Sequence, residues 1–70
     1  MKRRAVLKQI ELEAKRQGIS FALRERTNHT GIEVGHIKTV IGRHREIDEK
    51  AKISLFKQLQ PALGKGWWRK

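Results

Sequence analysis

The residues best suited to chemistry lie together in one short stretch of the chain. Residues 24–31 read RERTNHTG and combine two arginines, two threonines, one asparagine and one histidine at the end of a strand-like run. The imidazole of His29 can give or take a proton near neutral pH, and arginine side chains bind phosphate oxygens. The stretch therefore suits proton transfer at a phosphate group. The residues alone favour another interpretation, in which His29 is a turn residue that only bonds the backbone.

Two other histidines are weaker candidates. His36 opens a predicted strand and would face His29 if the strand register allowed it, which the sequence does not establish. His44 lies between Arg43 and Arg45, where contact with a phosphate group is its simplest functional role. For both histidines, a solvated loop position is the favoured alternative.

The candidate nucleic-acid contacts are basic or polar residues at helix starts, strands and turns. They are Lys2, Arg3, Arg4, Arg24, Arg26, Asn28, Lys38, Arg43, His44 and Arg45. Such side chains bind the sugar–phosphate backbone without reading base sequence, although a solvated helix end explains residues 2–4 as well. Trp67 and Trp68 would stack on unpaired bases, or pack on the core or on a partner protein, and packing is the favoured interpretation.

Composition points to a polyanionic partner. The 70 residues carry 17 Lys and Arg against seven Asp and Glu, a net charge of +10, and so large an excess favours nucleic acid over an acidic protein or an anionic membrane. The chain has no cysteine, so it has no disulfide and no thiolate ligand. No histidine or acid spacing suggests a metal site, and we expect no cofactor.

The chain is expected to stay in the cytoplasm. No apolar run approaches the ~20 residues of a membrane span, and the basic N-terminus is not followed by the apolar segment of a signal peptide. A chain this short makes one domain and buries a small core, so a partner chain is a plausible source of stability.

The elements that would position these residues follow from periodicity. Val6, Leu7, Ile10 and Ala14 form a helical stripe that predicts a helix over residues 3–17, with Gly18 at its end. From Ile19 the period changes to two, which predicts a strand whose core side includes Phe21 and Leu23, followed by a turn at residues 27–31.

Two further strands and a helix complete the predicted order. Residues 32–34 and 36–41 read as strands joined by a turn at Gly35, and Asp48 is placed to cap a second helix that ends near Pro61. The prediction is an α+β fold of order α-β-β-β-α, a three-stranded antiparallel sheet with two helices packed on one face. We assign residues 1–63 to one domain and residues 64–70 to a basic, Trp-containing tail.

The chain resembles the HicA family of toxins from HicAB toxin–antitoxin pairs, over residues 2 to about 59. The resemblance lies in the basic start of the first helix, the Thr27-Asn28-His29 segment in place of the family's Gly-Ser-His signature, and residues 40–44 in place of Val-Pro-x-His. Glu46-Ile47, followed by Leu55 and Leu59, resembles the family's last helix. Thr27, Asn28 and Gly42 depart from the residues that are usual in the family.

The resemblance implies a fold like that of double-stranded-RNA-binding domains. It further implies an RNA-cleaving toxin (an mRNA interferase) with His29 as the catalytic histidine, neutralised by a HicB-like antitoxin. Metal-free cleavage of RNA requires proton transfer by such an imidazole and cations that stabilise charge on phosphorus. Two alternatives stay open: a non-catalytic RNA- or DNA-binding module of the same fold, and a protein that only docks an acidic partner.

Overall fold

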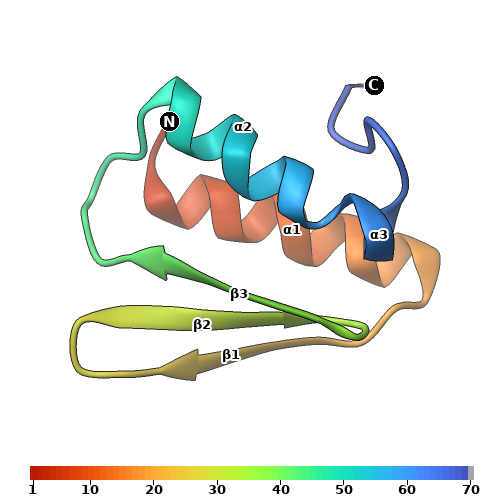
Figure 1. Ribbon diagram of the computed structural model, residues 1–70, viewed down its shortest axis with the longest axis horizontal. Helices are drawn as coiled ribbons and strands as arrows, with labels where there is room; N and C mark the ends of the chain where they lie inside the picture. The colour runs from red at the N-terminus through yellow and green to blue at the C-terminus, as the bar shows by residue number, and fades with distance from the viewer. Residues whose placement is uncertain (70) are drawn as a thin grey trace.

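The fold has two layers, a sheet of three strands and helices on one of its faces (Figure 1). The computed structural model describes residues 1–69. The elements in chain order are α1 (Arg3–Gln17), β1 (Phe21–Glu25), β2 (His29–Val34), β3 (Ile37–Gly42), α2 (Glu49–Gln58) and the short α3 (Gln60–Leu63). The predicted α+β class and the order α-β-β-β-α are confirmed.

Helix α1 forms for the reason that its sequence predicts. Val6, Ile10 and Ala14 recur every four residues, and all three are fully buried against the sheet and the other helices. Gly18 then takes the left-handed conformation, with φ of 72°, which glycine adopts without steric cost. This residue ends the helix and turns the chain into β1.

The sheet has β2 at its centre and runs antiparallel throughout. Alternate residues of β2 are buried beneath the helices, namely Thr30, Ile32 and Val34. The residues between them therefore lie on the other face, which no helix covers in Figure 1. We call it the open face.

The predicted second strand was too short. The sequence predicts that Gly31 belongs to a turn, but it lies within β2, opposite Arg24 of β1 and Val40 of β3. Backbone pairing on both sides holds this glycine in the strand, which overrides its local preference for turns. The strand therefore begins at His29 rather than at Ile32.

Helix α2 begins where the sequence predicts. The side chain of Asp48 accepts a hydrogen bond from the backbone N–H of Ala51, at 2.7 Å, as an N-cap residue does. Leu55, Phe56 and Leu59 are buried on the inner side of the helical segment. Pro61 lies in the first turn of α3, where its missing N–H costs no hydrogen bond.

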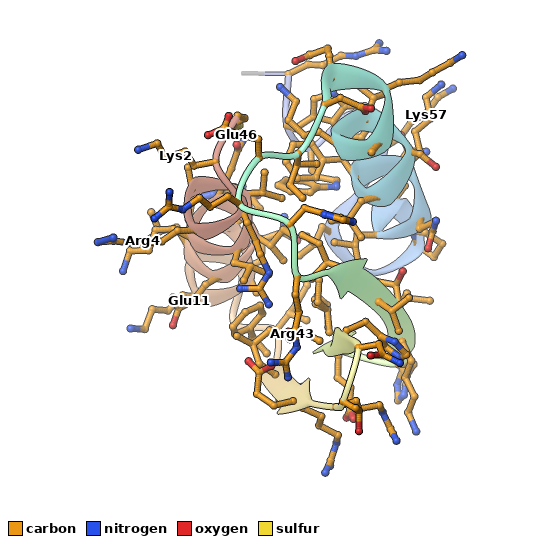
Figure 2. The ribbon with its side chains drawn as sticks, turned by 90° about the vertical axis from the view of Figure 1, so that its left-hand side faces the viewer. Lys2, Arg4, Glu11, Arg43, Glu46 and Lys57 are labelled. Carbon is orange, nitrogen blue, oxygen red and sulfur yellow. The ribbon has the colours of Figure 1, made fainter. Side chains whose placement is uncertain are left out.

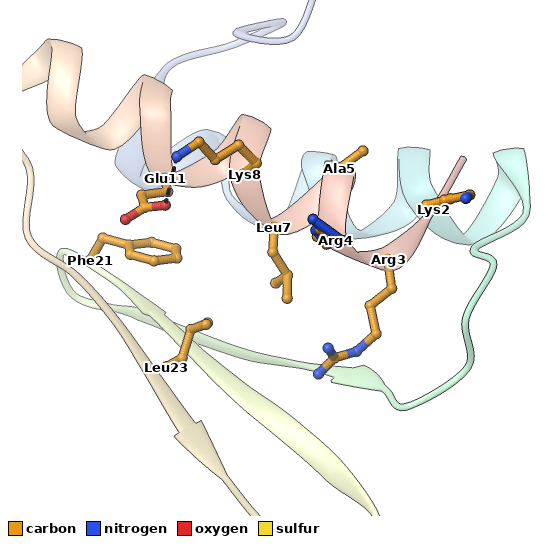
Figure 3. A pocket seen from close by; sticks show the side chains of 9 residues that line it. All are labelled: Lys2, Arg3, Arg4, Ala5, Leu7, Lys8, Glu11, Phe21 and Leu23. Carbon is orange, nitrogen blue, oxygen red and sulfur yellow. Dashed lines mark ion pairs between the residues drawn. The ribbon is translucent and has the colours of Figure 1, made fainter.

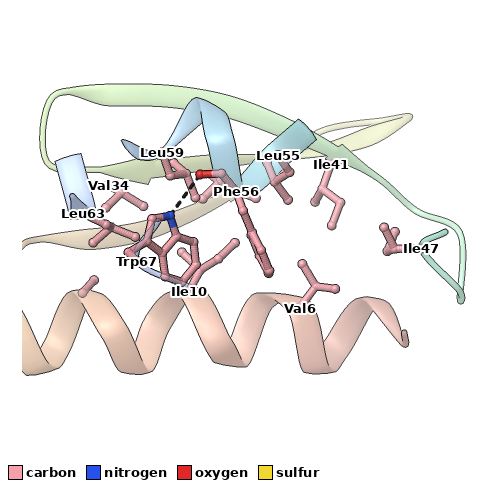
Figure 4. Close-up of a cluster of buried hydrophobic side chains, with 12 residues drawn as sticks. Val6, Ile10, Val34, Ile41, Ile47, Leu55, Phe56, Leu59, Leu63 and Trp67 are labelled. Atoms are coloured by element: carbon pink, nitrogen blue, oxygen red, sulfur yellow. Dashed lines mark hydrogen bonds between the residues drawn. The ribbon is translucent and has the colours of Figure 1, made fainter. Parts of the chain in front are cut away.

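The C-terminal segment packs on the core (Figure 4). Trp67 is 5% exposed, and its indole N–H donates to the carbonyl oxygen of Phe56 at 3.0 Å. The ring centroids of these two residues lie 4.7 Å apart. Trp68 is half-buried, with the Arg69 guanidinium 5.4 Å from its ring. Packing on the core is therefore confirmed for Trp67. Lys70, the last residue of the predicted tail, lies outside the described residues.

None of the helices in residues 1–69 combines the length and the apolar character that crossing a membrane requires.

Candidate functional site

Two basic segments that are distant in the sequence meet at one end of the molecule. The backbone of Lys2 pairs with that of Glu46 in an isolated antiparallel bridge. The N–H of Arg3 donates to the carbonyl of Arg45 at 2.9 Å, and the N–H of Ile47 donates to the carbonyl of Met1 at 2.8 Å. These bonds fix the start of α1 against the loop between β3 and α2.

A hollow of about 510 Å³ lies between the two segments. It is lined by Lys2, Arg3, Arg4, Arg43, Arg45 and Glu46, and we call it the basic hollow. Figure 2 looks onto this end and shows Lys2 and Arg4 projecting from α1, with Arg43 below them. Five cations and a single carboxylate make a strongly positive concave surface, which attracts polyanions.

Arg3 is bound within the fold. Its Nε donates to the carbonyl oxygen of Gly42 at 3.0 Å, and its Nη2 donates to the hydroxyl of Thr30. The Thr30 hydroxyl, which is fully buried, donates in turn to Glu25 at 2.8 Å. The sequence predicts Arg3 as an RNA contact. In the structure its side chain also joins α1 to β2 and β3, through Thr30 and Gly42.

Arg43 is also engaged within the fold. Its guanidinium donates to a carboxylate oxygen of Glu25 at 2.8 Å and to the carbonyl oxygen of Arg26. By contrast, no ion pair or hydrogen bond within residues 1–69 engages the side chains of Lys2, Arg4 and Arg45. These three cations are the ones available to a ligand in the basic hollow.

His29 lies at the same end of the sheet, as the first residue of β2. Its register partner is Gly42 of β3. The carbonyl of His29 accepts from the N–H of Arg26 at 2.9 Å, so its backbone groups point toward β1. His29 and Gly42 are therefore a pair without mutual hydrogen bonds, the kind whose side-chain positions lie closest. Both positions belong to the open face, because Thr30 and Ile41 beside them are buried.

His44 fills the place of the missing side chain at Gly42. A Cβ atom built on Gly42 would lie 3.3 Å from Cδ2 and 3.9 Å from Nε2 of His44. The His44 imidazole thus lies beside the side-chain position of Gly42, the residue opposite His29, at the edge of the sheet near the start of α2. The hypothetical contact between His36 and His29 does not form, because His36 lies in the turn at the other end of β2.

The remaining candidates lie along β1, β3 and the turn between β1 and β2. Arg24 pairs with Glu33 across the open face, and Lys38 is the register partner of Glu33 on the other side. This row of charges is partly neutralised by its central carboxylate. Arg26 and Asn28 are exposed in the turn just before His29.

A second concave surface, which sequence reasoning missed, runs between α1 and β1 (Figure 3). Its volume is about 730 Å³, and it is lined by Lys2, Arg3, Arg4, Ala5, Leu7, Lys8, Glu11, Phe21 and Leu23. The side chains of Leu7, Phe21 and Leu23 point toward one another, and Leu23 is 41% exposed. We call this surface the α1–β1 groove. The alternation of apolar and polar residues correctly predicts that Phe21 and Leu23 face the helix side of the sheet. It does not reveal that this side is exposed to solvent at Leu23.

Comparisons with protein-family models, with curated proteins and with solved structures find no match for this chain. Within residues 1–69, no three His, Cys, Asp or Glu side chains are grouped so that they could hold a metal ion.

Proposed function

We propose that this protein is an RNA-cleaving toxin of the HicA type, an endoribonuclease that acts on mRNA in the cytoplasm with a fold like that of double-stranded-RNA-binding domains. The observation that carries the proposal is the placement of His29 at the same end of the molecule as the basic hollow. An imidazole that exchanges protons near neutral pH is thereby combined with cations that bind a sugar–phosphate backbone.

The reaction would proceed without a metal ion. The 2′-hydroxyl oxygen of a ribose attacks the adjacent phosphorus as it loses its proton, and the bond from phosphorus to the 5′-oxygen breaks. His29 serves one of the two proton transfers. The free cations Lys2, Arg4 and Arg45 bind the sugar–phosphate backbone of the RNA and hold it at this end of the molecule. The products are a 2′,3′-cyclic phosphate and a 5′-hydroxyl.

RNA cleavage in EDTA by the wild type, His29→Gln and His36→Gln tests this function. His36→Gln is the matched control, because His36 lies at the opposite end of β2. We expect the wild type and His36→Gln to cleave, and His29→Gln to lose about 10²-fold or more of the rate, as removal of a general acid or base does. If all three proteins are folded and bind RNA but none of them cleaves it, the protein is instead the non-catalytic RNA- or DNA-binding module.

The α1–β1 groove is the surface that best fits the antitoxin. Its apolar floor is Leu7, Phe21 and Leu23, and Lys2, Arg4 and Lys8 on the same groove would attract acidic side chains of a HicB-like partner. β1 is also an edge strand, so its outward N–H and C=O groups are open to an added strand. An acidic partner there would also hinder access to the basic hollow, since the two surfaces share residues 2–4.

Growth of a host that expresses the toxin together with the product of the neighbouring gene tests this assignment. We expect Leu23→Arg to remain toxic but to escape neutralisation, because the substitution places a cation in the apolar floor. The control is Val40→Arg, which adds the same charge at a residue that is 56% exposed on the open face. Equal neutralisation of both variants would place the partner elsewhere.

A further inference from the structure

We infer that His44 is the second proton-transfer group of the site and acts with His29 across one phosphodiester. The inference rests on the proposed function and goes beyond it, because the sequence suggested only a phosphate contact for His44. The observation behind it is that His29 lies opposite Gly42 and that the His44 ring lies beside the side-chain position of Gly42.

The register of β2 and β3 brings the two histidines to one place. Opposite residues of an antiparallel pair have Cβ atoms about 4.5–5.5 Å apart, and Gly42 is the residue opposite His29. Since the Cβ position of Gly42 lies 3.3 Å from Cδ2 of His44, that carbon lies no more than about 9 Å from Cβ of His29. The two rings are therefore close enough to flank a single phosphodiester.

Both imidazoles are accessible to a substrate. His29 is half-buried at the sheet and His44 is exposed, so a substrate at this end of the sheet can reach both. Among residues 1–69 neither imidazole has a hydrogen-bond or ion-pair partner. Both rings are thus open to a substrate, unlike the ring of a histidine that holds a backbone turn.

The charged surroundings suit a phosphate between the rings. Arg26 precedes His29 in the turn after β1, and Arg45, whose side chain has no partner within residues 1–69, follows His44 in the loop after β3. Arg43, on the other side of His44, is held by Glu25 and by the Arg26 carbonyl. Arg3 of α1 bonds the Gly42 carbonyl. A smaller cavity, distinct from the basic hollow, lies beside His44, and the acids that line it are Glu46 of the same loop and Asp48 at the start of α2. Glu25, which binds Arg43 and Thr30, is the acid nearest to the start of β2.

The reaction then needs no other group for its protons. One imidazole takes the proton of the 2′-hydroxyl as its oxygen bonds to phosphorus, and the other, as imidazolium, gives a proton to the departing 5′-oxygen. One proton is accepted and one is donated, so nothing else is consumed. This pairing predicts a bell-shaped dependence of kcat/KM on pH in the wild type.

The test compares His44→Gln, His44→Lys and the control His36→Gln on a short RNA in EDTA, after circular dichroism has shown that each is folded. We expect His44→Gln to lose about 10²-fold or more in kcat and to lose one limb of the pH profile. His44→Lys should be no faster than His44→Gln, because lysine keeps a cation but does not exchange its proton near neutral pH. His36→Gln should retain the wild-type rate and profile.

A second substrate separates proton transfer from charge. In RNA with sulfur in place of the 5′-oxygen, the leaving thiolate needs no proton, so the variant that lacks the acid should recover most of its rate while the other does not. Recovery of one of the two variants, His29→Gln or His44→Gln, supports the inference. A wild-type rate in His44→Gln, or rescue by His44→Lys, would overturn it while the proposed ribonuclease activity stands. Absence of cleavage by the wild type would instead reject both.

Discussion

At the scale of single residues, Gly42 is important because its missing side chain leaves room for the His44 ring. It does not have a positive φ, so alanine is compatible with its backbone, and its Cβ would lie only 3.3 Å from the His44 ring. We expect Gly42→Ala to keep the free energy of unfolding within about 1 kcal/mol of the wild type, because an exposed imidazole can move aside. RNA cleavage should fall severalfold, since the ring is then displaced from its place opposite His29.

The control for that prediction is Gly31→Ala, also on the open face. A Cβ there would meet Arg24 at 3.5 Å, an ordinary contact, so the variant reports the general effect of alanine in this sheet. Urea unfolding and initial cleavage rates of both variants make the comparison. Unchanged cleavage in Gly42→Ala would mean that the position of the His44 ring is irrelevant to the reaction.

Thr30 is one of the two sheet residues that Arg3 of α1 binds. Its buried hydroxyl accepts from Arg3 and donates to Glu25 at 2.8 Å. Thr30→Val keeps the shape but removes both bonds and leaves polar groups unsatisfied, which typically costs about 1–3 kcal/mol. We expect a loss of that size in the free energy of unfolding, measured by urea denaturation.

Thr39→Val is the comparison for Thr30→Val. Its hydroxyl donates to Gln58 at 2.5 Å at an exposed position, where water can replace the lost bond. A loss below about 0.5 kcal/mol is therefore expected, as for most surface substitutions. If both variants were equally destabilised, the bonds of Thr30 to Arg3 and Glu25 would not be the cause.

At the scale of elements, local signals were predictable and long-range ones were not. The stripe of α1, the end of that helix at Gly18 and the cap at Asp48 depend on neighbours in sequence, and all three are as predicted. The start of β2 at His29 was missed because Gly31 is held in the strand by its partners on β1 and β3. Local propensity cannot report such pairing.

The C-terminal segment behaves as part of the core layer. Trp67 lies edge-on to Phe56 and donates to its backbone carbonyl, while Trp68 covers the outside of the same cluster. We expect Trp67→Ala to cost about 3–5 kcal/mol of unfolding free energy, as large-to-small changes of buried aromatic residues do. Because a domain of this size has only about 5–15 kcal/mol in all, much of its stability would be lost.

Trp68→Ala is the matched variant for Trp67→Ala. It removes the same side chain from a half-buried position, so its loss should be clearly smaller, because less apolar area leaves contact with the core. Chemical denaturation followed by far-ultraviolet circular dichroism measures both. Equal losses would show that the indole bond to Phe56 and the deeper burial of Trp67 contribute nothing extra.

At the scale of the whole molecule, the fold uses several acids internally and leaves cations at one end. Glu13 is paired with Arg16, whose pKa is raised by the hydrogen bond to that carboxylate and by its negative charge. Glu25 and Glu33 are paired with arginines across the strands. Residues 2–4 and 43–45 were each identified in the sequence as basic. That these two segments lie side by side was not predictable, because it depends on backbone hydrogen bonds between residues that are far apart in the sequence.

The position of this charge predicts how RNA binding responds to salt. Each phosphate contact to a single strand contributes a slope of about 0.7 in log affinity against log salt. If Lys2 and Arg4 contact phosphates in the basic hollow, Lys2→Gln combined with Arg4→Gln should lower the slope by about 1.4. Lys50→Gln combined with Lys57→Gln removes the same charge from α2, where Lys57 projects away from Lys2 and Arg4 (Figure 2). That control should keep nearly the wild-type slope.

Fluorescence anisotropy of a labelled RNA at several salt concentrations measures the slopes of the parent protein and of the two double variants. All three proteins also carry His29→Gln, which prevents cleavage. Equal slopes for the two double variants would show that RNA responds to total charge and not to the hollow.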